Sequence, residues 1–154
     1  MTAKKTGPGT TLSAVPWHIH FFQRHREDDP TEAVPGRAFL LACPDKVRQT
    51  MVAVLKAVAD APPPAFAGGG KWEAMHDDMA GYYEVRVDGP KRRHYRLFCI
   101  LERDGKNLGL VGPSVVVITG KEKPFQTTLS KSDYGDVRSL GSEYQAHLPR
   151  SVAE

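Results

Sequence analysis

The 154-residue chain contains only two cysteines, Cys43 and Cys99, and neither lies in a CxxC or mixed Cys/His spacing. Two thiols are too few for a disulfide framework, and a cysteine-ligated zinc site is excluded by their spacing. Both stand inside apolar stretches, where a thiol usually packs as a small hydrophobic side chain.

Long hydrophobic runs are also absent, so no segment is expected to cross a membrane. The opening residues, MTAKKTGPGTT, lack the apolar stretch of a signal peptide, which predicts a cytoplasmic protein with no membrane partner. Residues 1–14 are expected to be a flexible tail, and residues 15–150 a single domain. A hydrophobic content of 40% is enough for one core.

Familiar catalytic motifs are missing as well. The triple glycine Gly68–Gly70 is not followed by a GK[ST] sequence, so we interpret it as a connector rather than a phosphate-binding loop. No nucleophile elbow or carboxylate pair can be identified. His18, His20 and His25 are close in sequence, but no cysteine or carboxylate is spaced to complete a metal site with them. We therefore expect no metal and no cofactor.

What the chain does have is regular periodicity. Residues 17–22 are expected to form a first strand, and a 3.6-residue stripe after Pro44 predicts a helix that stops at Pro62–Pro64. Alternation predicts three antiparallel strands near 82–87, 94–101 and 115–118, and Ser130 with Asp133 resembles a capping box that opens a last helix. The expected fold class is α+β: a small antiparallel sheet with an N-terminal strand, helices packed on one face and a C-terminal helix.

The same alternation predicts which side chains are buried between sheet and helices. The expected core is Val54, Leu55, Val58, Tyr83, Val85, Val87, Tyr95, Leu97, Cys99, Val115 and Val117.

Net charge is only +3, but basic residues are concentrated. Between Arg86 and Arg96 there are five lysines or arginines against one aspartate. Alternation places Arg86 and Arg96 on one surface, away from the main aliphatic face, and Lys121 and Lys123 follow the next strand. Aromatic or imidazole groups interleave with these charges at Tyr82, His94 and Phe98. A cationic sheet surface with stacking groups is typical of proteins that bind single-stranded RNA.

Four blocks, GYYEVRVDG, HYRLFCILERDG, VVVITGKEKP and SDYGDVRSLGSEY, resemble the successive strands and closing helix of the RelE/ParE toxin superfamily. The similarity is to its RelE/HigB members, and specifically to the phage-derived HigB-like branch. It implies a toxin of a type II toxin-antitoxin system that cleaves mRNA on the ribosome and inhibits translation. The implied partners are ribosome-bound mRNA and a cognate antitoxin with a helix-turn-helix domain.

The resemblance also implies roles for individual residues. It places the arginine that faces the scissile phosphate at Arg96, and the catalytic set that it implies is Arg86, Arg96, Lys121, Lys123 and Tyr134. The expected RNA-binding residues are Lys71, Lys91, Arg92, Arg93 and His94. Glu122 departs from the family pattern, because many relatives carry two adjacent cations there, and it is expected to lower the local positive potential.

The implied chemistry is a metal-independent endoribonuclease reaction. Arg96 suits stabilisation of the phosphorane, Lys121 or Lys123 is a candidate base, and Tyr134 is a candidate proton donor to the leaving oxygen. Arg96 is expected to be solvated, so that its loss would cost little stability. Two other functions remain open: a ParE-like poison of DNA gyrase, and a non-catalytic interaction module on the same fold.

Overall fold

The computed structural model describes residues 15–61 and 70–153. The expected tail at residues 1–14, the prolines at 62–64, and Gly68 and Gly69 lie outside the described residues.

Five strands form one sheet: β2 (His18–Phe21), β3 (Trp72–Ala74), β4 (Tyr82–Gly89), β5 (Arg93–Glu102) and β6 (Ser114–Pro124). Their order across the sheet is β2-β6-β5-β4-β3. The α+β class is confirmed, but the sheet is mixed, because β2 runs parallel to β6 while the other neighbours are antiparallel. The three strands that were expected to be antiparallel, β4, β5 and β6, are antiparallel, and the expected N-terminal strand β2 joins them in parallel. Strand β3 was not expected.

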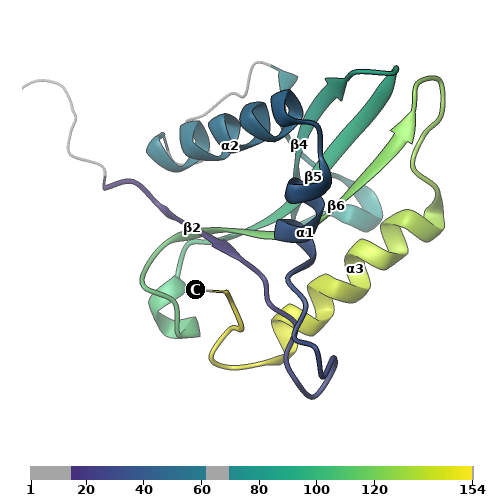
Figure 1. The fold of residues 1–154 in the computed structure, drawn as a ribbon. Helices are drawn as coiled ribbons and strands as arrows, with labels where there is room; N and C mark the ends of the chain where they lie inside the picture. The colour runs from purple at the N-terminus through teal and green to yellow at the C-terminus, as the bar shows by residue number, and fades with distance from the viewer. Residues whose placement is uncertain (1–14, 62–69, 154) are drawn as a thin grey trace, which may run out of the picture.

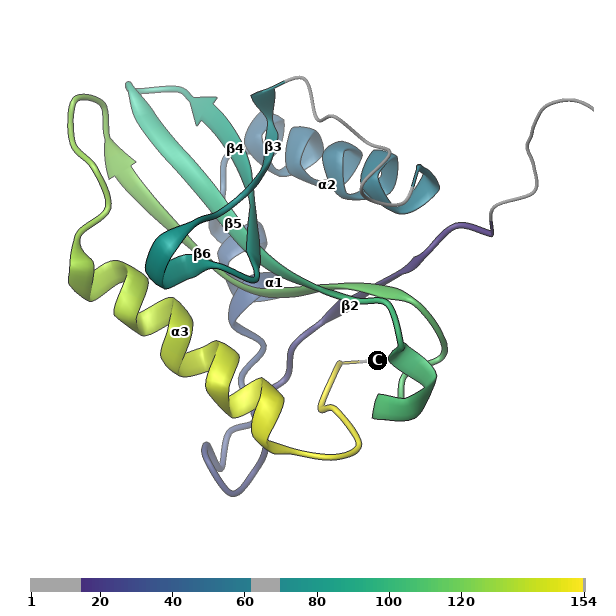
Figure 2. The same ribbon diagram turned by 180° about the vertical axis from the view of Figure 1, so that it is seen from behind.

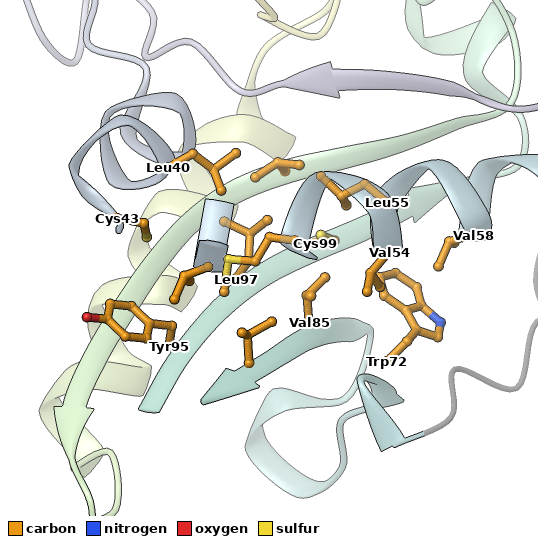
Figure 3. Packing of buried hydrophobic residues seen from close by; sticks show 14 of the residues in the cluster. Leu40, Cys43, Val54, Leu55, Val58, Trp72, Val85, Tyr95, Leu97 and Cys99 are labelled. Carbon is orange, nitrogen blue, oxygen red and sulfur yellow. The ribbon is translucent and has the colours of Figure 1, made fainter. Parts of the chain in front are cut away.

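Helices α1 (Pro35–Ala42) and α2 (Asp45–Asp60) cover one face of the sheet (Figure 1). Val54, Leu55 and Val58 of α2 pack there against the strands, as the helical stripe predicted (Figure 3). The predicted core is confirmed: ten of its eleven side chains are buried, and Tyr83 packs against them while partly exposed.

The opposite face is covered by α3 (Lys131–Ala146), which lies across the sheet from α2 (Figures 1 and 2). The predicted capping box is present, since the Ser130 hydroxyl accepts from the Asp133 N–H and the Asp133 carboxylate accepts from the Ser130 N–H. Val137 and Tyr144 of this helix pack on a second core that includes Phe98. The sheet face that was expected to contact RNA is therefore largely covered by the protein's own helix.

A β-bulge in β6 decides where its basic end points. Phe98 of β5 pairs with Thr119 and Cys99 pairs with Val117, so Ile118 is an extra residue on β6. Beyond the bulge the alternation is shifted by one residue. Lys121 and Lys123 consequently pair opposite Arg96 and His94, and all four side chains lie on the α3 face.

Two short 3₁₀ helices, η2 (Asp77–Met79) and η3 (Gly105–Leu108), complete the described elements. Within residues 15–61 and 70–153, every helix is too short or too polar to cross a bilayer.

Candidate functional site

A pocket of about 250 Å³ opens between the sheet and the N-terminal end of α3. It brings together residues from β4, β5, β6 and α3, together with the segment that joins β6 to α3. Its lining consists of Glu84, Arg86, His94, Arg96, Lys123, Thr127, Thr128, Leu129 and Tyr134. Four of the five residues expected to be catalytic therefore meet in one place, and the fifth, Lys121, lies beside it opposite Arg96.

Arg86 and Arg96 are direct neighbours across β4 and β5, as the alternation predicted. Arg86 is bound by Glu73, with Nη1 2.9 Å from Oε2. Arg96 donates from Nη1 to the Tyr95 carbonyl at 2.9 Å, and its side chain is only 14% exposed. The expectation of a solvated Arg96 was wrong, because α3 and the segment before it shield this part of the sheet.

The two lysines of β6 are bound by the first turns of α3. Lys123 Nζ lies 3.1 Å from Asp133 Oδ2, and Lys121 Nζ lies 3.0 Å from Asp136 Oδ2. The capping-box hydrogen bonds and Lys123 lower the pKa of Asp133 to about 2. Both lysines are therefore held in ion pairs with carboxylates of α3, an arrangement that does not suit a general base.

Glu84 was missed by the sequence reasoning. It pairs opposite Phe98 on the pocket face of β4, its side chain is 13% exposed, and Oε1 lies 3.5 Å from Arg86 Nε. Burial raises the pKa of this carboxyl group, even though Arg86 and Arg96 act in the opposite direction. The alternation of Tyr82–Val87 already placed Glu84 beside Arg86, but only the covering helix explains its burial.

Tyr134 stands on α3 with its ring edge-on to Phe98, at a centroid distance of 6.2 Å. Burial, reinforced by Glu84, raises the pKa of its hydroxyl group. The phenol therefore stays protonated at neutral pH. Phe98 itself is fully buried and Tyr82 nearly so, which corrects the expectation that they would be available for base stacking.

At the end of the pocket, the Nδ1 atom of His94 lies 2.6 Å from Asp88 Oδ1. Its ring stacks on Phe125, with centroids 4.5 Å apart, and Arg92 lies over the same phenyl ring at 5.5 Å. Lys91 and Arg92 form the turn between β4 and β5 with positive φ angles of 60° and 56°. Phe125 is a second residue that the sequence reasoning missed, since it follows the last predicted strand without a periodic signal.

Two expected features lie elsewhere. Arg93 shares the alternation of Tyr95, so it points to the α2 face, where its Nη2 lies 3.0 Å from Glu122 Oε1. Glu122 therefore does not face the pocket, which corrects the expectation that it weakens the potential there; the bulge in β6 is the cause. Lys71 is exposed at the outer edge of the sheet, in a shallow groove that Arg86 and Arg96 also line.

The surface as a whole is a network of ion pairs rather than an open cationic face. The basic members of the network are Arg86, His94, Arg96, Lys121 and Lys123, and the acidic members are Glu73, Glu84, Asp88, Asp133 and Asp136. Such pairing weakens the long-range attraction of a polyanion.

Comparison with known proteins gave no match: no family model, curated protein or solved structure is similar to this chain.

Proposed function

We propose that the protein is a metal-independent endoribonuclease and the toxin of a type II toxin-antitoxin system. The observation that carries this proposal is the convergence of a largely buried carboxyl group, two arginines and a protonated phenol in one pocket, at Glu84, Arg86, Arg96 and Tyr134. RNA cleavage by its own 2′-OH requires a base, a group that stabilises the phosphorane and an acid for the leaving 5′-oxygen.

Each requirement has a matching residue. Glu84 serves as the base that takes the 2′-OH proton, since its raised pKa strengthens a carboxylate for this role. The guanidinium of Arg96, with Arg86 beside it, stabilises the dianionic phosphorane by charge-assisted hydrogen bonds. Tyr134 donates the proton that the leaving oxygen needs. This assignment replaces the lysines, which the sequence favoured as the base, with Glu84.

The ion-pair network also bears on the partners. Because every cation of the pocket faces a carboxylate, free RNA gains little from entering, and the bound geometry must be supplied by something else. We propose that the ribosome supplies it by presenting mRNA to the pocket, in the cytoplasm. The cognate partner in the resting cell is an antitoxin with a helix-turn-helix domain, encoded next to the toxin.

The test is to induce the chain in a bacterial host and to map mRNA cleavage by primer extension. Arg96→Lys keeps the charge and roughly the length of this partly buried side chain but loses the planar fork that binds two phosphate oxygens. Glu84→Gln keeps the shape but removes the base. Each is expected to lower cleavage at least about a hundredfold, the usual contribution of one such group. Cleavage in a translation extract is expected to persist when a chelator selective for transition metals is added and the Mg²⁺ that ribosomes need is left in place.

Arg93→Lys is the matched control, since Arg93 lies on the same strand but faces the opposite side of the sheet. It is expected to cleave as the wild type does. Cleavage that survives both pocket substitutions contradicts the proposal. Growth arrest without cleavage but with inhibited DNA supercoiling would instead favour the gyrase poison. Neither growth arrest nor cleavage would favour the interaction module.

A further inference from the structure

A second cluster of polar side chains lies at the far end of α3 from the pocket. His25 and Glu27 stand in the turn that follows β2, and His147 is the residue that ends α3. One potential ligand atom from each of the three lies within 4.8 Å of the others. The imidazole rings of His25 and His147 are stacked, with centroids 4.0 Å apart and planes 6° from parallel. Sequence reasoning considered His25 but not this group, because His147 follows His25 by more than a hundred residues.

Hydrogen bonds hold the residues of this cluster in place. Asp28 Oδ2 lies 2.9 Å from His147 Nε2, and the Arg150 guanidinium donates to the His147 carbonyl at 3.0 Å. On the other side, the N–H groups of Asp28 and Asp29 both donate to the His25 carbonyl at 2.9 Å. The two backbone segments that carry the imidazoles are therefore fixed, and His25 Nδ1 also accepts from the Glu27 N–H at 3.1 Å. The Glu27 side chain is exposed.

Two imidazoles and a carboxylate are a donor set that late first-row divalent cations prefer. A carboxylate that orients a histidine from the side away from the metal is also a common feature of such sites, and Asp28 stands in that relation to His147. We propose that His25, Glu27 and His147 bind a divalent transition-metal ion such as Zn²⁺. The two rings must turn out of their stack to do so, because a metal lies in the plane of each imidazole that binds it.

Such an ion would join parts of the chain that are distant in sequence. The segment after His147 returns to the first strand, where Ser151 and Phe21 carbonyls accept from the Gln23 and Ala153 N–H groups at 3.1 and 2.8 Å. A metal between the turn at His25 and the end of α3 would reinforce this junction. Its role would be structural, because Tyr134 and His147 are separated by about 20 Å along the helix axis.

The experiment uses the full chain without a histidine tag, stripped with a chelator and dialysed. Isothermal titration with ZnCl₂ is expected to show one ion per chain with a Kd of about 10 μM or lower. A zinc concentration one hundred times the Kd should raise Tm by about 5–10 °C. Co²⁺ bound in place of Zn²⁺ should give the visible absorption bands of a site with a low coordination number. The pocket residues take no part, so these results do not depend on the proposed ribonuclease activity.

Variants locate the site. His25→Gln and His147→Gln are each expected to weaken Zn²⁺ binding more than tenfold and to abolish the rise in Tm, whereas Asp28→Asn, which only orients His147, should weaken it about tenfold. His76→Gln is the control, because His76 is exposed beside η2 and outside the cluster. The proposal is overturned if the wild type binds no zinc below about 1 mM. It is equally overturned if both histidine variants bind as the wild type does, or if His76→Gln has the same effect as they have.

Discussion

Helix α3 carries two glycines whose replacement by alanine should change stability in opposite directions. In a helix interior, alanine is favoured over glycine by about 1 kcal/mol, because glycine loses more backbone entropy on folding. Gly135 lies in the first half of α3, and an added Cβ there would meet nothing closer than the Arg138 guanidinium at 3.9 Å. Gly135→Ala should therefore stabilise the protein by about 0.5–1 kcal/mol.

Gly141 is buried against β4, and the Tyr82 side chain occupies the space that a Cβ would need. The added atom would lie 1.9 Å from the Tyr82 hydroxyl oxygen and 2.8 Å from Cζ. Tyr82 is itself buried, so its ring cannot simply swing into solvent. Overpacking of this kind costs about 1–3 kcal/mol, which at least cancels the gain in helix propensity. Gly141→Ala should leave stability unchanged at best and lower it by about 2 kcal/mol at worst.

Urea denaturation of the two variants provides the measurement. Both variants replace glycine by alanine in the same helix, so the gain in helix propensity cancels when their free energies of unfolding are subtracted. The remaining difference is the steric cost at Gly141, which should be about 1–3 kcal/mol. Tyr82→Phe removes the nearest atom and should recover part of the loss when it is combined with Gly141→Ala. If both glycine variants are stabilised equally, the close approach of α3 to β4 described above is wrong, and so is the burial of Glu84 that depends on it.

Two further predictions concern polar groups that are shielded from solvent. Glu84→Gln should keep or raise stability at pH 7 while activity falls, because a carboxyl group whose pKa is raised by folding stabilises the fold only when protonated. The free energy of unfolding of the wild type should therefore rise relative to that of the variant as the pH falls through the folded pKa of Glu84 toward its unfolded value. Urea titrations at several pH values would test this, and a difference that stays constant with pH would contradict it. Tyr144→Phe should cost about 1.5–3 kcal/mol, because the buried hydroxyl donates to the Glu102 carboxylate at 2.8 Å. Thermal unfolding would measure this loss, and a variant as stable as the wild type would refute the bond.

Local periodicity in the sequence determined much of the fold of this protein. Alternation in β4 and β5 assigned each side chain to its face, and the 3.6-residue stripe of α2 marked its buried side correctly. The prolines that follow α2 and the capping box at Ser130 and Asp133 marked helix ends. These signals are readable because each depends on the chain's own repeat or on residues three or four positions apart.

Only the tertiary structure decided the contents of the site. The bulge at Ile118 turns Lys121 and Lys123 toward the pocket and Glu122 away from it. It leaves no periodic trace, because residues 115–118 are apolar on both faces and show no alternation that the extra residue could interrupt. Packing of α3 on the second sheet face buries Glu84. His147 meets His25 only because the end of α3 lies against the turn after β2. Burial, ion pairing and the meeting of distant side chains arise from long-range packing, which no local pattern in the sequence encodes.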